Sequence, residues 1–184
     1  MDDIIYVDDT PSGSIAESAL PELREYLSWC DGLLLAGELS NNSETELLIA
    51  ELLQEVTVPT VCASDLAQLL WRNLPQINAD QLCVLCDYRA IQKLIIEQKL
   101  PIMLKQSDPP QTARDVVSEL QKATGLSFII EHQQQLIVGV DSQISQTPGQ
   151  MNQRLLAEAA VLMTQFPARR FEALTTAVYL SVAD

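Results

Sequence analysis

Short apolar runs alternate with amphipathic segments along most of the chain. Successive apolar residues over the length of a strand are typical of strands buried on both faces, and apolar residues at every third or fourth position are typical of helices that pack on a sheet. Strands that alternate with helices predict an α/β fold with a mainly parallel sheet. The predicted strands are residues 4–7, 32–36, 59–62, 82–86, 102–104 and 127–130, and the predicted helices are residues 14–27, 44–54, 65–71, 88–98 and 112–124.

Turn and capping residues predict where several of these helices begin and end. Ser14 followed by Glu17 fits a capping box, and Ser43 fits the N-cap of the next helix. The Pro-Pro pair at 109–110 breaks the chain before helix 112–124, and Gly125 fits the C-cap of that helix.

The last third of the chain departs from the alternating pattern. Three glutamines at 133–135 separate the apolar runs 128–130 and 136–140, so these runs are predicted to pair as an antiparallel hairpin. A helical pair follows, and Phe166-Pro167 separates its members. The two predicted helices are residues 151–163 and 168–183.

Composition narrows the classes of protein and partner. The 184 residues are 47% hydrophobic and show no internal repeat or linker, so one domain over residues 1–184 is predicted. The net charge of −14, from 25 acidic and 11 basic residues, disfavours nucleic acid and anionic membrane surfaces as partners. No apolar run approaches the roughly 20 residues needed to span a bilayer, and the start lacks the basic region of a signal peptide. A cytoplasmic location is therefore expected.

The four cysteines are interpreted as free thiols. Cys83 and Cys86 have the spacing of half a zinc site, but no second pair follows and the only histidine, His132, is remote in sequence. Residues 82–86 are an apolar run of strand length, in which cysteine packs as a small hydrophobic residue. No metal site is expected.

Other polar and aromatic residues have two interpretations each. His132 could be a base, but a lone histidine near a hairpin turn favours a surface position. Asp65 could be a site residue or an N-cap, and Asp87 could be a catalytic carboxylate at the carboxyl edge of the sheet, although no partner base is near it in sequence. Trp29 and Trp71 are expected to be core or interface residues rather than ligand-stacking residues.

Three strings, in their order and spacing, are similar to those of the NAD(P)H-hydrate dehydratases, a branch of the ribokinase-like carbohydrate kinases. Residues 30–40 occupy the place of an Ala-Asp-Gly lead and a glycine-rich loop, residues 59–67 match a Pro-Val-Val-Leu-Asp-Ala-Asp-Ala-Leu strand end, and residues 171–184 match the last helix. The resemblance implies a three-layer ribokinase-like fold, truncated at the N-terminus, that starts after the family's first strand, glycine-rich turn and helix. It also implies chemistry coupled to ADP or ATP hydrolysis.

The chain departs from this family at the residues that carry the chemistry. The family's Gly-Thr-Gly-Asp turn corresponds to residues 151–154, which places Arg154 where a proton-accepting aspartate is expected and puts side chains at Asn152 and Gln153. Tyr88 replaces a histidine of the family, and Glu131 replaces a lysine. The second replacement reverses the charge, so it repels nucleotide phosphate. The first aspartate of the strand end and the glycines of the first loop are also replaced. The resemblance therefore implies a pseudoenzyme with no catalytic residue and doubtful nucleotide binding.

The expected function is that of a binding or structural protein derived from this family, with no cofactor. An active dehydratase or kinase-like enzyme completed by another chain, using ADP or ATP and NAD(P)H, is the second hypothesis, and an unrelated α/β binding module is the third. A homo-oligomer or a protein partner is expected to cover an exposed sheet edge. The candidate ligand residues of the remnant crevice are Gly37, Glu38, Asp65, Asp87, Tyr88, Gly149, Asn152 and Arg154.

Overall fold

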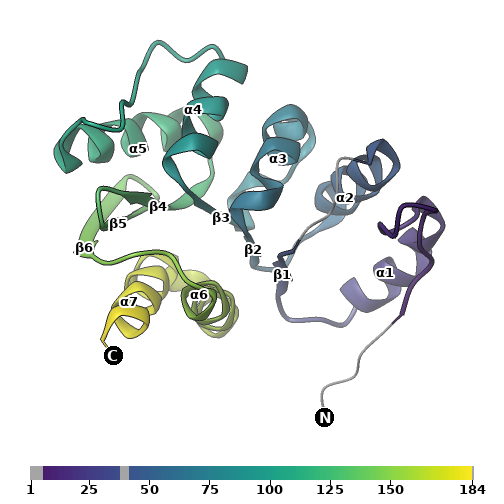
Figure 1. Cartoon of the computed structure of the whole chain (residues 1–184). Coiled ribbons are helices and arrows are strands. Elements are labelled where there is room, and N and C mark those ends of the chain that lie inside the picture. Colours follow the sequence, from purple (N-terminus) through teal and green to yellow (C-terminus); the bar gives the residue numbers. More distant parts are fainter. Residues whose placement is uncertain (1–5, 38–41, 184) are drawn as a thin grey trace.

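The computed structural model describes residues 6–37 and 42–183, and its helices and strands alternate over the first two thirds of the chain (Figure 1). The strands are β1 (Leu33–Leu35), β2 (Thr60–Cys62), β3 (Leu82–Cys86), β4 (Ser127–His132), β5 (Gln135–Val140) and β6 (Gln143–Pro148). The α-helices are α1 (Leu20–Leu27), α2 (Ser43–Glu55), α3 (Ala67–Asn73), α4 (Tyr88–Glu97), α5 (Pro110–Thr124), α6 (Gln153–Gln165) and α7 (Arg170–Val182). Short 3-10 turns are η1 (Glu17–Ala19), η2 (Ser64–Leu66), η3 (Leu74–Gln76), η4 (Ala79–Gln81) and η5 (Pro167–Arg169).

All six strands belong to one sheet, in the order β1-β2-β3-β4-β5-β6. The first four run parallel to one another, and the last two add antiparallel pairs. Parallel neighbours need a crossover between them, and α2, η2 with α3, and α4 with α5 supply these crossovers. The predicted mainly parallel α/β sheet is thus confirmed.

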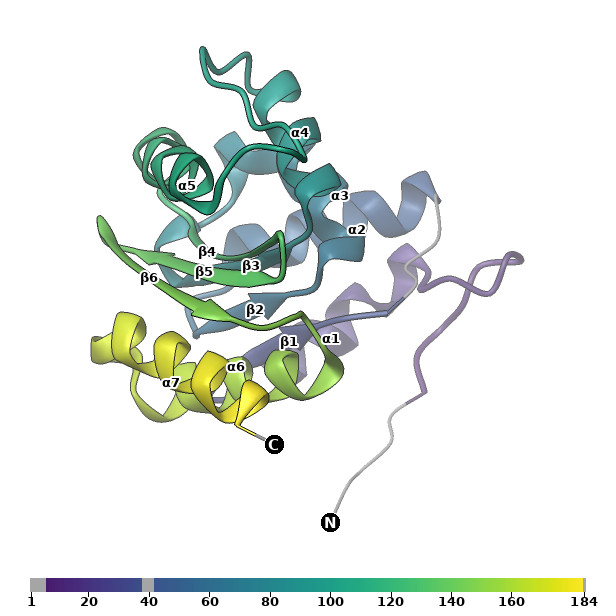
Figure 2. The ribbon, with the colours of Figure 1, turned by 60° about the vertical axis from the view of Figure 1, so that its left-hand side comes forward.

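Two helical layers cover the sheet (Figure 2). Helices α2 to α5 pack on one face, against Cys62, Val84 and Phe128, and α1 packs beside α2. Helices α6 and α7 pack on the other face, against side chains such as Cys83 and Ile129. Neighbouring strand residues therefore serve opposite cores, which explains why strand β3 is apolar and buried throughout.

The C-terminal sheet is larger than the sequence predicted. The hairpin of β4 and β5 is confirmed, and Gln133 and Gln134 form its turn with φ of 49° and 59°. A second turn at Asp141 and Ser142 leads into β6, which the sequence analysis missed. Strand β6 is mainly polar and has no buried residue, so it lacks the apolar run by which the other strands are recognised.

Several predicted boundaries were wrong. Residues 102–104 form no strand, and Leu104 is nevertheless buried. The predicted strand 4–7 lies partly outside the described residues, and its described half, Tyr6 and Val7, has no regular structure. Ser14 does not cap a helix: it is buried beside Thr10, and the first turn starts only at Glu17, after Ala16. The N-cap of α2 is Asn42 rather than Ser43.

Other local predictions were confirmed. Gly125 ends α5 with φ of 73°, and its N–H donates to the Gln121 carbonyl at 2.8 Å. Phe166 and Pro167 separate α6 from α7. Across residues 6–37 and 42–183, no helix has the length and apolar character that a bilayer span requires.

Candidate functional site

The predicted ligand residues lie in segments that meet at one edge of the sheet. The carboxyl ends of parallel strands share an edge, and β6 runs in the same direction as β4 because two antiparallel steps separate them. The start of α6 follows β6, so it reaches the same edge. The residues placed here are Gly37 after β1, Asp65 after β2, Asp87 and Tyr88 after β3, and Gly149, Asn152 and Arg154 after β6, whereas Glu38 lies outside the described residues.

A small crevice opens at this edge, between the end of β2 and the start of α6. Its volume is about 200 Å³, and its polar groups are the Ser64 hydroxyl and the amides of Asn152 and Gln153. These groups can donate and accept hydrogen bonds, but none can take up a proton near neutral pH. The lining residues are Ala63, Ser64, Leu85, Met151, Asn152, Gln153 and Leu156.

The chain's own side chains bond one N–H group in the first turn of α6 and one just before the helix. Asn152 has extended backbone angles, and its Oδ1 accepts a hydrogen bond from the Leu155 N–H at 2.8 Å, as expected of an N-cap. The Glu131 carboxylate, from β4, accepts a hydrogen bond from the Met151 N–H at 2.9 Å. A helix N-terminus attracts anions through its free N–H groups. The Glu131 carboxylate lies against the backbone just before the helix, one residue ahead of its N-cap.

Arg154 does not line the crevice. It lies in the first turn of α6, its side chain is 46% exposed, and its Nε is 3.7 Å from Glu158 one turn further along. The structure therefore places this guanidinium on the surface of its own helix. Among the predicted ligand residues that the structure describes, Asn152 is the one that lines the crevice.

The two candidate aspartates lie at the starts of the helical segments that follow β2 and β3. Asp87 is the N-cap of α4, and its Oδ1 accepts a hydrogen bond from the Ala90 N–H at 2.8 Å. Asp65 lies exposed in the turn η2, where no side-chain capping bond forms, so its N-cap interpretation was wrong. The α3 helix starts from Leu66 instead.

Tyr88 and His132 form a packed aromatic contact. Their ring centroids are 6.1 Å apart, and the Tyr88 hydroxyl accepts a hydrogen bond from Gln92. His132 is buried, and its Nε2 is 2.7 Å from the Asp108 carbonyl oxygen. The predicted surface position of His132 was wrong, because β4 extends past Ile130 and the loop before α5 covers its end.

Gly149 has a packing role that the sequence analysis did not identify. A Cβ at this position would lie 2.4 Å from Val182 Cγ1 and 3.1 Å from Leu136 Cδ1. Only glycine therefore lets the segment before α6 approach β5 and α7 this closely. Gly37 has a different requirement, since its φ of 106° is disfavoured for residues with a Cβ.

The cysteines are structural. Cys62, Cys83 and Cys86 are buried, and burial raises the pKa of each thiol. Cys83 and Cys86 serve opposite cores, so they cannot share a metal ion. Within the described residues, no three Cys, His, Asp or Glu side chains gather in a way that could bind a metal. Trp71 is a core residue, whereas Trp29 is 67% exposed and packs edge-on against Tyr26.

Sequence reasoning missed most of the crevice lining. Ser64 and Met151 lie within strings that the resemblance covers but were not chosen as ligand residues, Leu85 and Leu156 carried no motif, and Glu131 was noted only for its charge. A possible signal was Asn152 itself, because asparagine before an amphipathic run is a frequent N-cap.

Comparisons with known proteins identify the fold. No protein-family model matches the sequence, and a search of curated proteins finds no significant match. A ribokinase-like superfamily protein from Enterococcus faecalis V583 superimposes with a TM-score of 0.69 at 14% identity, over 90% of this chain and 58% of its own. A hypothetical protein from Streptococcus mutans superimposes with a TM-score of 0.67 at 15% identity, over 88% of this chain and 59% of its own. The chain thus spans somewhat less than three fifths of these structures, and over that length it adopts a ribokinase-like α/β fold.

Proposed function

We propose that the chain is a catalytically degenerate protein, similar to the NAD(P)H-hydrate dehydratases, that acts as a binding or structural protein. The observation that supports this most is the hydrogen bond from the Met151 N–H, just before the N-cap of α6, to the Glu131 carboxylate. In ribokinase-like enzymes that resemble this chain, a helix start of this kind is expected to hold phosphate. Here a carboxylate of the protein itself lies against the backbone that leads into such a helix start.

Charge and size at the crevice support the same proposal. A second anion beside Glu131 meets like-charge repulsion, which is strong at short range in a partly shielded site. The crevice volume of about 200 Å³ is also below the roughly 300 Å³ at which ligand pockets usually begin. Among the described residues its lining supplies no general base, because the polar side chains there are a hydroxyl and two amides.

Thermal unfolding with ADP, ATP and NADPH tests the proposal. We expect no change in Tm with any of them, whereas a ligand at a hundred times its Kd adds about 2.7 kcal/mol to the free energy of unfolding. The matched control is Ser64→Leu, which fills the crevice without a change of charge. A nucleotide-dependent rise in Tm that Ser64→Leu abolishes would contradict the proposal.

An open sheet edge favours a second candidate function, in which another chain completes the molecule. Strand β1 pairs with β2 on one side, and the described residues supply no strand on the other. The Leu33 N–H and the Leu35 carbonyl both bond toward β2, so the backbone groups of Leu34 face outward. The opposite edge, β6, is polar and ends in Pro148, which discourages pairing.

An apolar groove continues from this edge. Its volume is about 400 Å³, and Leu34 and Val161 on its walls are 40% and 50% exposed. A homo-oligomer or a dedicated partner protein that adds a strand to β1 buries both side chains. If that chain also supplies phosphate-binding and proton-accepting groups, the assembly is an ADP- or ATP-dependent enzyme that acts on NAD(P)H hydrate. The groove residues are Gly32, Leu33, Leu34, Ala157, Ala160, Val161, Thr164 and Gln165.

Size-exclusion chromatography with light scattering tests this candidate. An assembly larger than the 20.4 kDa monomer is expected, and Leu34→Asp should dissociate it because a buried charge opposes strand pairing. Leu47→Asp, at an exposed leucine on α2, is the control that should leave the assembly intact. A clean monomer without a co-purifying protein rejects the candidate. Dehydratase activity in the assembled fraction would decide for the enzyme over the degenerate protein.

A further inference from the structure

A second apolar groove lies in the opposite helical layer, between α4 and the segment that follows it. Its volume is about 460 Å³. Ile96 and Met103 on its walls are 73% and 66% exposed, which is high for large apolar side chains that lie close together. The lining residues are Gln92, Ile95, Ile96, Lys99, Leu100, Ile102, Met103 and Leu104.

The groove exists because residues 102–104 do not join the sheet. The segment has no regular structure and turns Leu104 inward, while Met103 stays at the surface. One apolar wall therefore comes from α4 and the other from the segment that follows it. The groove is partly open to the surface, so a segment of protein chain can place apolar side chains in it.

Charge distinguishes this surface from the rest of the molecule. Residues 88–106 contain four of the eleven Lys and Arg of the chain but one of its 25 Asp and Glu. Arg89, Lys99 and Lys105 are exposed, and none of them is ion-paired with a carboxylate in the described part of the chain. A groove with apolar walls and cationic flanks on a strongly acidic protein is complementary to an acidic, partly apolar ligand.

We propose that this groove docks a segment of another protein that combines acidic residues with large apolar side chains. The apolar side chains contact Ile96 and Met103, and the carboxylates lie near Lys99 and its basic neighbours. A second copy of this chain fits less well: its acidic helix α2 carries the exposed Leu47, but Arg24 and Arg72 already engage Glu51, Glu55 and Glu46 of that helix. An anionic membrane is disfavoured by the net charge of −14.

Peptide selection tests the proposal and does not require an identified partner. A library of random peptides displayed on phage is selected on the immobilised full chain, and the best sequences are synthesised with a fluorescent label. We expect the selected peptides to be rich in Asp and Glu around Leu, Ile, Phe or Met. Ile96→Ser and Lys99→Glu should each weaken their binding about tenfold or more, because each removes one part of the recognition.

Two control variants match these substitutions. Leu47→Ser removes an apolar side chain of similar exposure from α2, and Arg169→Glu makes the same change of charge on the far side of the sheet. All four positions are exposed, and circular dichroism melts verify that each variant is folded. The proposal is overturned if no peptide is enriched, if the selected peptides are not acidic, or if the controls weaken binding as much as the groove variants.

Two further measurements test whether the groove instead binds a second copy of the chain or a membrane. Light scattering that shows a dimer of the wild type and a monomer of Ile96→Ser would assign the groove to a second copy and overturn the proposal. Flotation with phosphatidylserine vesicles that Ile96→Ser abolishes would assign it to a membrane, with the same consequence.

Discussion

Gln121 is a buried amide whose hydrogen bonds are missing. It lies on α5 with 8% of its surface exposed, and neither its Oε1 nor its Nε2 has a hydrogen-bond partner among the described residues. Its amide lies close to Gly139 of β5, in an otherwise apolar layer. Leaving a buried polar group unpaired costs about 1–3 kcal/mol. At the scale of single residues, this position is the clearest source of instability in the fold.

Replacing Gln121 with methionine should therefore stabilise the protein. We expect the free energy of unfolding to rise by about 1 kcal/mol, because the side chain keeps its length but loses the unpaired amide. Urea unfolding followed by circular dichroism measures the change. Gln98→Met is the matched control and should have the opposite sign, since the Gln98 Nε2 donates to the Trp71 carbonyl at 2.8 Å. Equal destabilisation by both variants would show that Gln121 has a partner in solution.

A substitution of Gly149 tests whether this residue is needed for packing, as the structure indicates, rather than for ligand binding. Gly149→Ala should lower the free energy of unfolding by about 1–3 kcal/mol, because the new Cβ overlaps Val182 Cγ1 at 2.4 Å. Adding Val182→Ala to this variant should recover part of the loss, since it removes the clashing methyl group. If chemical denaturation finds Gly149→Ala as stable as the wild type, the packing explanation is wrong.

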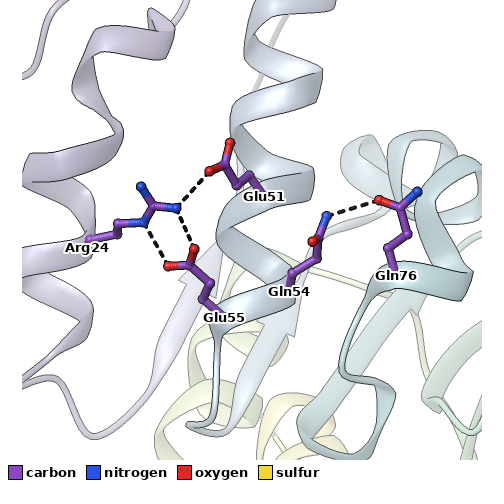
Figure 3. A network of polar contacts seen from close by, with 5 residues as sticks. All are labelled: Arg24, Glu51, Gln54, Glu55 and Gln76. Atoms are coloured by element: carbon purple, nitrogen blue, oxygen red, sulfur yellow. Dashed lines mark hydrogen bonds and ion pairs between the residues drawn. The ribbon is translucent and has the colours of Figure 1, made fainter.

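At the scale of elements, one arginine joins α1 to α2 (Figure 3). The Arg24 Nε donates to Glu55 at 2.8 Å, and its Nη2 donates to Glu51 at 2.7 Å and also to Glu55. The hydrogen bond from Arg24 holds the pKa of Glu55 below its ordinary value of 4.5. The three side chains are 39–47% exposed, so solvent and salt screen the pairing.

The contribution of Arg24 to stability should depend on pH. A carboxyl whose pKa is lowered by folding stabilises the fold above pH 4.5, its unfolded value, and loses that effect as pH falls through its lower folded value. Arg24→Gln should therefore be less stable than the wild type at pH 7, with the difference narrowing below pH 4.5. Urea unfolding across this range measures it. Added salt at pH 7 should narrow the difference too, and a difference independent of both pH and salt would contradict the electrostatic origin.

At the scale of the whole molecule, the sheet is unequal across its width. Strand β3 is buried throughout and has two neighbours, whereas β1 has three residues, one neighbour in the described chain and an exposed Leu34. Both proposed contact surfaces lie away from the buried centre: one follows the β1 edge, and the other lies on the outside of α4. The buried centre of the sheet supports both surfaces. The open β1 edge is held by fewer contacts, so it should unfold locally more readily than the centre.

Amide hydrogen exchange should show this inequality. We expect the slowest exchange in β3 and β4 and much faster exchange in β1, because opening an edge strand exposes little apolar surface. Mass spectrometry of peptides from the exchanging protein measures the difference. Equal protection of β1 and β3 would mean that another chain covers the edge under the conditions used, which a repeat at lower protein concentration would reveal.

The sequence by itself determined the features that rest on local periodicity. The alternation of apolar runs with amphipathic segments predicted β3, the β4–β5 hairpin, α4 to α7 and the mainly parallel sheet. These elements are predictable because burial on one face or on both faces determines which neighbouring residues in the sequence are apolar. Gly125 was equally predictable, since a helix that ends in the left-handed conformation favours glycine.

Only the tertiary structure decided what depends on contacts between distant segments. Strand β6 is polar and forms because β5 offers it an edge, residues 102–104 look like a strand but find no neighbour, and His132 is buried because a loop two dozen residues earlier covers it. The contact between Glu131 and the Met151 N–H is of the same kind. It joins β4 to the residue just before the N-cap of α6, and the local sequence of neither segment predicts this contact.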